Sequence, residues 1–274
     1  MERYGLIAGN GKFPLLVLEA ARCRGIDMVV VAIKEETFQE IEKVARVVHW
    51  QSLGQLGKLV ETFKTEKVTH AIMAGQVKHK QIFSDIVPDL KMLKMLTSLR
   101  TKNTDSLIGG VAKILAEEGI TLLDSTHFLE PLLPKPGVLT ERSPTHDEAR
   151  DIDYGRRIAN EIARLDLGQT LVVRNQACLA VEAMEGTDAV IRRAAEFAGG
   201  HPLVVVKVSK PYQDMRFDVP VVGLPTVTLM AEVKASALAI DAYKTLLIDR
   251  DPLIALANQR GISIVAMDPS RELK

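Results

Sequence analysis

Four short apolar runs, separated by stretches with helical periodicity, constrain the fold of the first half of this chain. The runs are Gly5–Ala8, Met28–Ile33, Val68–Ala74 and Ile120–Leu123. Their continuous apolar character is typical of strands that are covered on both faces, as in a parallel sheet. Strands that alternate with helices predict an α/β fold, and here a Rossmann-like, doubly wound parallel sheet.

The remaining pattern completes the set of expected elements. In the first half we expect helices at Pro14–Arg24, Leu53–Phe63, Asp89–Leu99 and Asp105–Glu117. In the second half we expect helices at Asp147–Leu165, Thr187–Ala198, Glu232–Leu246 and Asp251–Arg260, and strands at Gln169–Arg174, Cys178–Ala183, Leu203–Val208 and Ile262–Ala266. The second half is therefore also predicted to be an α/β domain.

A proline-rich segment separates the two halves. Phe128–Pro144 contains Pro131, Pro134, Pro136 and Pro144, and such a composition is typical of linkers. We predict a nucleotide- or phosphate-binding domain at residues 1–130, a linker at 131–144 and a catalytic α/β domain at 145–274.

Composition excludes several classes of protein. Lys and Arg together number 35, as do Asp and Glu, so no global positive field favours nucleic acid. No apolar run approaches the roughly 18 residues that span a bilayer, and the N-terminus lacks the apolar core of a signal peptide. Cys23 and Cys178 predict buried thiols and a reducing compartment rather than a disulfide framework. We expect a cytoplasmic protein.

The loop Gly9-Asn10-Gly11-Lys12 joins the first expected strand to the first expected helix. Backbone N–H groups at such a junction bind phosphate or diphosphate. Pro14 replaces the third glycine of the dinucleotide fingerprint, and Phe13 replaces the magnesium-binding Ser/Thr of a Walker A loop. We predict that the loop binds a nucleotide's phosphates; a plain tight turn is the alternative.

The stretch Lys207–Gly223 concentrates charged and polar groups after a buried strand. Between and beside Pro211 and Pro220 it carries Lys210, Gln213, Asp214, Arg216 and Asp218. The two prolines exclude a helix or a central strand. The carboxylates suit a divalent cation or the activation of water, and the cations suit phosphate oxygens. The alternative is a surface turn whose charges neutralise one another.

A second acidic group surrounds the start of an expected helix. Glu182, Glu185 and Asp188 lie close in sequence, and Gly186 and Thr187 open the helix with Thr187 or Asp188 as its N-cap. This loop can ligate a metal while the amides at the helix start face a phosphate. A capped helix with acidic residues in its first turn is the alternative. The six histidines show no spacing of paired ligands, so we expect no zinc site.

Several motifs in this chain resemble those of the LpxI family. They are G-L-I-A-G-N-G-K-F-P at 5–14, A-G-Q-V-K at 74–78, T-D-S-L-I at 104–108, L-G-Q-T-L-V-V at 167–173, E-A-M-E-G-T-D-A-V-I-R-R at 182–193 and K-P-Y-Q-D-M-R-F-D-V-P-V-V-G at 210–223. The resemblance spans essentially the whole chain. It departs from the family at Thr104-Asp105, where paired aspartates are expected.

The resemblance implies a UDP-2,3-diacylglucosamine diphosphatase of lipid A biosynthesis, built from a Rossmann-like N-terminal domain and a distinct α/β C-terminal domain. Such an enzyme releases UMP and 2,3-diacylglucosamine 1-phosphate, with the substrate between the domains and a divalent cation, Mg²⁺ or Mn²⁺, as cofactor. The resemblance singles out Asp218, in R-x-D-x-P, as the essential residue.

Residues and resemblance together give one set of expected site residues. We expect catalytic groups at Asp218, Asp214, Arg216 and Lys210, substrate-binding groups at Gly9, Asn10, Gly11, Lys12, Gln76, Gly186, Thr187 and Gln213, and metal ligands at Asp218, Asp188 and Glu185. The partner is an amphiphilic UDP-sugar lipid rather than nucleic acid.

Three further questions stay open from the sequence. Leu90, Leu93 and Leu96, with Lys91 and Lys94 nearby, form a face that meets either the protein core or lipid at the inner membrane. A homodimer is also open. The alternative functions are a nucleotide-dependent oxidoreductase, with Glu35 on a ribose, and a UDP-sugar-binding protein without catalysis.

Overall fold

The chain forms two compact units in the computed structural model, which describes residues 2–77, 87–99 and 104–270, with backbone alone for residues 104 and 105. Unit 1 comprises Met1–Leu129 together with Asp214–Asp218, and unit 2 comprises Glu130–Gln213 together with Val219–Lys274. Lys78, expected in a family motif, and the Asp105 side chain lie outside the described part.

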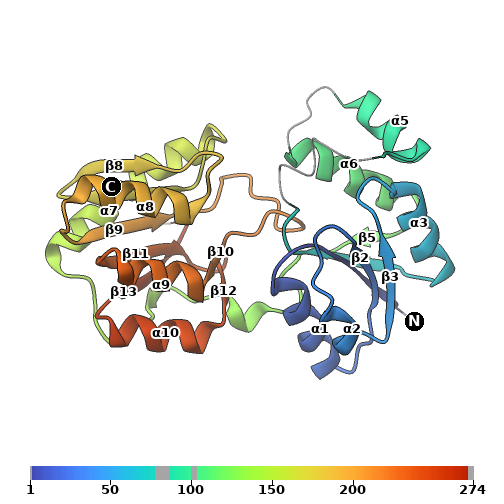
Figure 1. Ribbon diagram of the computed structural model, residues 1–274, viewed down its shortest axis with the longest axis horizontal. Helices are drawn as coiled ribbons and strands as arrows, with labels where there is room; N and C mark the ends of the chain where they lie inside the picture. Colours follow the sequence, from blue (N-terminus) through green and yellow to red (C-terminus); the bar gives the residue numbers. More distant parts are fainter. Residues whose placement is uncertain (1, 78–86, 100–103, 271–274) are drawn as a thin grey trace. The chain divides into compact units, whose positions relative to one another are not determined.

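Unit 1 is built on a five-stranded parallel sheet (Figure 1). Its strands, in the order β3-β2-β1-β4-β5, are β1 (Tyr4–Ala8), β2 (Val29–Ile33), β3 (Val47–Gln51), β4 (His70–Ala74) and β5 (Thr121–Leu122). The Rossmann-like sheet predicted for the N-terminal half is thereby confirmed. β3 was not predicted, because it is an edge strand whose residues are mostly half-buried and partly polar.

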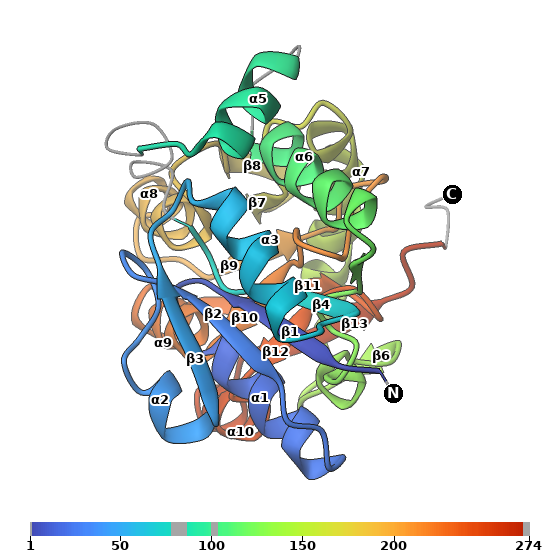
Figure 2. The same cartoon turned by 90° about the vertical axis from the view of Figure 1, so that its right-hand side faces the viewer.

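Helices cover both faces of this sheet (Figure 2). One face carries α1 (Phe13–Cys23) and α2 (Ile41–Val44); the other carries α3 (Leu56–Thr65), α5 (Leu90–Ser98) and α6 (Thr104–Glu117). On the second face Phe63, Met95 and Leu115 belong to one buried apolar cluster. Such double coverage explains why β1 and β2 are apolar along almost their whole length.

Unit 2 is built on a mixed six-stranded sheet. In the order β6-β13-β11-β9-β7-β8 its strands are β6 (Gly137–Val138), β13 (Ser263–Met267), β11 (Ala235–Asp241), β9 (Leu203–Lys207), β7 (Thr170–Arg174) and β8 (Ala177–Val181). β9, β11 and β13 are parallel, whereas β7 runs antiparallel to both of its neighbours. β10 (Val221–Gly223) and β12 (Leu246–Ile248) form a separate parallel pair.

The helices of unit 2 also cover both faces of its sheet. α7 (His146–Arg164) packs on one face, and α8 (Thr187–Ala198), α9 (Leu224–Glu232) and α10 (Arg250–Gln259) pack on the other. A short 3₁₀ helix, η1 (Glu130–Leu132), precedes the sheet in sequence. No helix within the described ranges is long and apolar enough to cross a membrane.

One predicted helix is wrong. Residues 235–241, expected within a helix at 232–246, form the central strand β11, and the helix lies earlier, at Leu224–Glu232. Lys234 has a φ of 61°, which is left-handed and ends the helix just before the strand. The sequence A-S-A-L-A-I-D favours a helix by local propensity, but burial between β9 and β13 makes it a strand.

The structure also bears on the predicted buried thiols and on the predicted linker. Cys23 and Cys178 are both exposed free thiols, so the prediction of buried thiols is wrong. Residues 137–142, expected in the linker, are integrated in unit 2: β6 pairs with β13, and the Arg142 side chain donates to the carbonyls of Ser236 and Gly261. The domain limits at 130 and 145 stay a prediction.

Candidate active site

The Gly9–Lys12 loop lies at the carboxyl ends of β1 and β4 in unit 1. The Gly9 N–H donates to the Ala74 carbonyl at 2.8 Å, and Asn10 and Gln76 exchange backbone hydrogen bonds of 2.7 and 3.1 Å. Lys12 is the N-cap residue of α1, without a capping side chain. The structure therefore brings the five substrate-binding residues predicted in the first half onto one edge of the sheet, where open α/β sheets bind ligands.

The close approach of these two loops requires glycine. A Cβ atom on Gly9 would lie 2.7 Å from the Gln76 carbonyl oxygen, and one on Gly75 would lie 2.6 Å from the Asn10 carbonyl oxygen. Gly75 also has a φ of 92°, which is unfavourable for other residues. The backbone of the loop after β1 therefore packs directly against the backbone of the loop after β4, and Gln76 in the second loop is exposed.

The segment after β2 supports the same loop. The Asn10 Nδ2 donates to the Glu36 carbonyl at 3.0 Å, and the Thr37 hydroxyl donates to the Ala8 carbonyl at 2.6 Å. Glu35, the ribose ligand of the oxidoreductase alternative, accepts a hydrogen bond from the Leu53 N–H. The Asn10 side chain therefore positions the loop, a role that was not predicted from the sequence.

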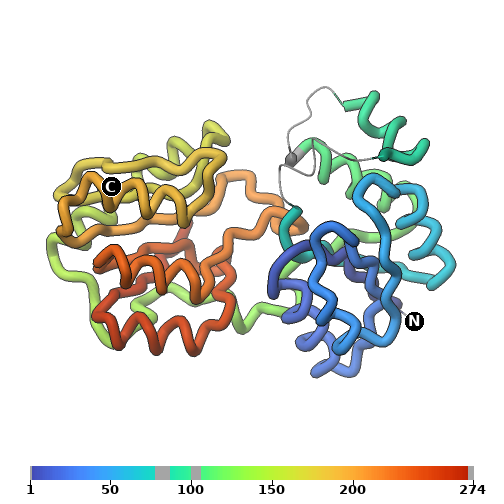
Figure 3. Tube along the Cα trace, viewed as in Figure 1, coloured from blue at the N-terminus to red at the C-terminus, as the bar shows by residue number. Residues whose placement is uncertain are grey.

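Asp214–Asp218 forms a compact turn that belongs to unit 1, although the residues on either side belong to unit 2. The N–H groups of Phe217 and Asp218 donate to the Asp214 carbonyl. Ser125, which is 1% exposed, donates through its N–H to the Met215 carbonyl and through its hydroxyl to the Arg216 carbonyl, both at 2.8 Å. Figure 3 shows the long connection from β9 to β10 that contains this turn.

Most charged groups of this connection are ion-paired. Arg216 binds Asp214 through Nε at 2.9 Å and through Nη2 at 2.6 Å, and Lys210 binds Asp166 at 2.8 Å. The hydrogen bonds with Arg216 lower the pKa of the Asp214 carboxyl, and Asp214 raises the pKa of Arg216. For Asp214 and Arg216 the structure thus shows the mutual neutralisation that the surface-turn alternative describes.

A buried ion pair holds the start of the same connection. Asp241, at the end of β11, accepts from the N–H and the hydroxyl of Ser209 at 2.6 and 2.8 Å and from Arg156 Nη1 at 2.7 Å. The Asp241 and Arg156 side chains are only 2% and 3% exposed. The far end is held as well, because the Leu246 N–H donates to the Pro220 carbonyl. This support was not predicted, because Asp241 was expected inside a helix.

A polar network lies at the start of α8 in unit 2. Gly186, with a φ of 85°, is the N-cap, so the prediction of Thr187 or Asp188 at that position is wrong. The Thr187 hydroxyl instead contacts Glu182 at 2.9 Å and accepts from Lys207 Nζ at 2.7 Å. Glu182 and Lys207 are each 6% exposed. The lysine and the helix N-terminus attract anions, while the Glu182 carboxylate on the same hydroxyl offsets part of the positive charge.

The predicted metal ligands of unit 2 have protein partners. Glu185 accepts from Arg193 at 2.6 Å and from the Ala183 N–H, and Asp188 accepts from the Thr226 hydroxyl at 2.8 Å. A hydrogen bond from its own backbone N–H, together with those from Arg193 and the Ala183 N–H, lowers the pKa of the Glu185 carboxyl. Across residues 2–77, 87–99 and 104–270, no three His, Cys, Asp or Glu side chains cluster as metal ligands. These side chains therefore do not form a ready chelating set.

Solved structures resemble this chain only weakly. CobK precorrin-6A reductase is 12% identical and matches 99% of this chain and 91% of its own, with a TM-score of 0.30. The biotin carboxylase domain of Hydrogenobacter thermophilus 2-oxoglutarate carboxylase is 13% identical, with a TM-score of 0.29, and the match covers 72% of this chain and 41% of that one. Neither likeness carries an argument about function.

Sequence relatives are far more informative. The model of the LpxI N-terminal domain matches residues 3–132, and that of the LpxI C-terminal domain matches residues 135–265. UDP-2,3-diacylglucosamine pyrophosphatase LpxI of Caulobacter vibrioides is 31% identical over 98% of this chain and 99% of its own length. With both of its halves matched, and with a Rossmann-like unit followed by a second sheet unit, the chain belongs to the LpxI family.

Proposed function

We propose that this chain hydrolyses the diphosphate bond of UDP-2,3-diacylglucosamine to UMP and 2,3-diacylglucosamine 1-phosphate, a step of lipid A biosynthesis. The observation that carries the proposal is the match of both units to an LpxI pyrophosphatase over nearly the full length of both chains. The match favours hydrolysis over the oxidoreductase and over the binding protein without catalysis.

We assign the hydrolytic step to the Asp214–Asp218 turn. In this step a water oxygen bonds to one phosphorus, the bond from that phosphorus to the bridging oxygen breaks, and the water proton passes to a base. Asp218 is the proposed base, because it is a half-buried carboxylate at the end of a turn that Ser125 holds from outside the loop. Asp214 has a different proposed role, which is to orient Arg216.

Charge neutralisation is the main requirement of diphosphate cleavage, since negative charge spreads over the phosphoryl oxygens in the transition state. Four cations, each of which already has a partner in the structure, are candidates for it: Lys12 at the N-cap of α1, Lys207 at the end of β9 with its Nζ on Thr187, and Lys210 and Arg216 in the connection from β9 to β10. Lys210 and Arg216 carry carboxylate partners. We infer that phosphate oxygens take over part of these contacts when substrate binds.

Candidate substrate-binding groups are assigned in each unit separately. Gly11 and Gln76 offer half-buried or exposed backbone and amide groups in unit 1, where the buried Gly9 sets the path of the loop, and Gly186 and Thr187 begin α8 in unit 2. The Gln213 side chain accepts from the Lys210 N–H at 2.7 Å, so we assign it the shape of the loop rather than a direct contact.

We also propose a divalent cation, Mg²⁺ or Mn²⁺, as cofactor. When bound, it would offset the charge of the diphosphate. Asp218, Asp188 and Glu185 are the carboxylates that would hold it, and Glu185 and Asp188 would exchange their present protein partners for the cation. Removal of metal by EDTA should abolish UMP release, and millimolar Mg²⁺ or Mn²⁺ should restore it. Full activity in excess chelator would contradict the cofactor.

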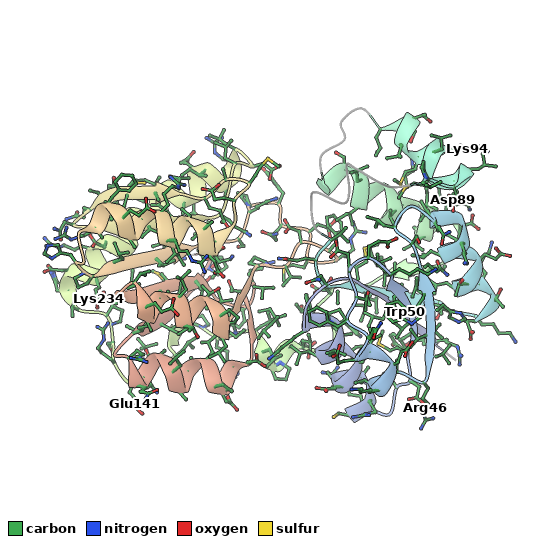
Figure 4. All side chains as sticks on the ribbon, viewed as in Figure 1. Arg46, Trp50, Asp89, Lys94, Glu141 and Lys234 are labelled. Atoms are coloured by element: carbon green, nitrogen blue, oxygen red, sulfur yellow. The ribbon has the colours of Figure 1, made fainter. Side chains whose placement is uncertain are left out.

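Finally, we propose cytoplasmic action with peripheral contact at the inner membrane, where the acylated substrate resides. Met92, Leu96 and Met95 on α5 pack into the core of unit 1, whereas Leu90 and Leu93 are 78% and 48% exposed. Of the predicted face, Leu96 packs on the core, whereas Leu90 and Leu93 do not, and these two are the residues that we propose contact lipid. Figure 4 labels Lys94 and Asp89 on this segment. A homodimer stays a prediction.

The experiment that tests the function is release of UMP from UDP-2,3-diacylglucosamine in detergent micelles, followed by chromatography of the nucleotide. Mass spectrometry of the lipid product identifies the bond that breaks, because hydrolysis in ¹⁸O-labelled water places the label on one phosphate only. Absence of UMP release under all metal conditions would overturn the proposal.

A further inference from the structure

A surface pocket of unit 1 is not used by the chemistry described above. It measures about 490 Å³ and is lined by Lys34, Thr37, Gln39, Glu42 and Trp50. These residues come from the end of β2, from the segment that leads into α2, from α2 itself and from β3. Figure 4 labels Trp50 on that strand. The volume falls in the range of small-molecule sites.

Two walls of the pocket are held in place by hydrogen bonds. The Thr37 hydroxyl accepts from the Ile33 N–H at 2.9 Å and donates to the Ala8 carbonyl at 2.6 Å. The Trp50 indole N–H donates to Glu42 Oε1 at 2.7 Å. These hydrogen bonds hold the Thr37 side chain in place and favour one orientation of the indole ring, which lowers the entropic cost of binding.

Two other lining groups have unused hydrogen-bonding capacity. Within the described part of the chain, the Lys34 ammonium and the Gln39 side-chain amide have neither an ion pair nor a hydrogen bond. Both residues are exposed. The pocket thus offers an aromatic surface, a cation that only donates, and an amide that both donates and accepts.

The pocket adjoins the phosphate loop. Thr37 bonds to Ala8, the residue directly before Gly9, and the neighbouring Glu36 carbonyl accepts from the Asn10 side chain at 3.0 Å. A ligand whose phosphates lie on Gly9–Lys12 can therefore extend over Thr37 into the pocket. This direction follows the carboxyl edge of the sheet from β1 to β2 and β3.

We infer that this pocket binds the uracil ring of a uridine nucleotide, an inference that rests on the proposed function. Uracil is flat and can stack on the indole of Trp50. Its two carbonyl oxygens accept hydrogen bonds, for which Lys34 is a donor, and its N3–H and neighbouring carbonyl form a donor–acceptor pair that matches the Gln39 amide. Cytosine has an amino group in place of one carbonyl, and the donor-only Lys34 disfavours it.

The chain contains one tryptophan, so its intrinsic fluorescence reports on this pocket. We expect UMP to quench Trp50 emission saturably, and CMP to bind about tenfold more weakly, the loss expected for one hydrogen bond to a charged group. Ribose 5-phosphate carries the phosphate without the base and should leave the emission unchanged. Equal quenching by UMP and ribose 5-phosphate would overturn the inference.

Substitutions in the pocket distinguish UMP binding there from binding elsewhere that changes Trp50 fluorescence indirectly. Lys34→Ala and Gln39→Ala should each weaken UMP binding about tenfold by calorimetry, and Trp50→Phe should abolish the optical signal while UMP heat remains. Lys43→Ala removes another lysine, on α2 and not in the pocket lining, and should leave the affinity unchanged. If Lys34→Ala and Gln39→Ala bind UMP like wild type, the pocket is not the uracil site.

The outcome is independent of the hydrolytic assignment. The same variants are assayed with UDP-2,3-diacylglucosamine, where a rise in KM at constant kcat is expected because the ring lies away from the reacting phosphorus. Wild-type hydrolysis with no effect of either variant on KM would remove the uracil site and leave the enzyme function standing. Tight, uracil-selective binding of UMP without hydrolysis of the substrate would support the uracil site and contradict the enzyme function.

Discussion

At the scale of single residues, the partner of each charge decides its role. Asp214 and Asp218 are four positions apart in one turn, and Asp214 is bound by two nitrogens of Arg216. This bidentate pair is a strong orienting contact, and it makes Asp214 a support for the guanidinium. Asp218, whose N–H closes the turn onto the Asp214 carbonyl, is the carboxylate that we assign to the chemistry.

Asp218→Ala should therefore abolish turnover with little change in stability. Loss of a water-activating carboxylate lowers the rate about 10²–10⁴-fold, roughly 3–5 kcal/mol of barrier. The measurement is kcat for UMP release, with thermal unfolding as the check on folding. Asp153→Ala, an exposed carboxylate on α7, is the matched control and should retain full activity. Activity of Asp218→Ala within threefold of wild type would remove Asp218 from the mechanism.

At the scale of elements, ion pairs join helices and loops that are distant in sequence. Glu118, just after α6, binds Lys64 of α3 at 2.5 Å and also binds Lys91 of α5. The hydrogen bonds from these two lysines lower the pKa of the Glu118 carboxyl from 4.5 to about 2. Since the side chains are partly exposed, salt screens the interaction.

The lowered pKa predicts an acid-dependent contribution to stability. The carboxylate is stabilised in the folded state, so its contribution is complete above the unfolded pKa of 4.5 and is lost as the pH falls toward 2. Glu118→Gln should thus lower the melting temperature at pH 6, and the difference from wild type should vanish near pH 2. Circular dichroism at several pH values measures this. Glu117→Gln, whose pair with Lys113 is 3.9 Å long and exposed, should show no such trend.

The ion pair between Asp241 and Arg156 also joins distant elements, but unlike that of Glu118 it is buried. Removing one partner of a buried ion pair leaves an uncompensated charge, so Asp241→Ala should lower the free energy of unfolding by about 3–5 kcal/mol. Asp241→Leu combined with Arg156→Met should recover much of this loss, but not the hold on Ser209. Urea unfolding measures stability, and kcat of the double variant measures loop positioning. Asp147→Ala, which removes an exposed ion pair with Arg150, should change neither the free energy of unfolding nor kcat. If the double variant has the kcat of wild type, the hydrogen bonds of Asp241 to Ser209 are not needed for activity.

At the scale of the whole molecule, the two units do not coincide with two halves of the sequence. Asp214–Asp218 is part of unit 1, and β6 with Arg142 is part of unit 2. Arg142 binds Glu148 through two nitrogens at 2.7 and 3.0 Å and also donates to the Ser236 carbonyl. A cut placed by composition alone would therefore remove contacts that stabilise the second unit.

Two fragments of the chain that begin at different residues test this division into units. A fragment of residues 130–274 should fold, whereas one of residues 145–274 lacks β6 and Arg142 and should melt more than about 5 °C lower, as expected for a loss on the order of 1 kcal/mol. Neither should release UMP, because Gly9–Lys12 and Ser125 are absent. Equal melting temperatures would show that β6 is dispensable, and near full-length activity of residues 130–274 would show that unit 1 is not required.

Much of the architecture could be predicted because it depends on local patterns. β1, β2 and β4 are continuous apolar runs bounded by loops, and α1 and α8 have clear amphipathic spacing. In each of them the spacing of apolar residues in the sequence agrees with the residues that are buried in the structure. The Gly9–Lys12 loop and Gln76 could be predicted to lie together because parallel strands end at one edge. β3 and β11 could not, since their strand state depends on neighbours rather than on local propensity.

The amino-acid sequence alone was enough to identify the family, and to predict the glycine loop and the clustered charges of residues 210–218 as candidate site residues. The pairing of those groups became known from the folded structure. Arg216 is bound to Asp214, Glu182 and Lys207 meet at Thr187, and Asp241 holds Ser209 across 32 positions. The physical reason is that electrostatic and hydrogen-bonding partners are set by distance in space, which chain spacing does not encode beyond a few residues.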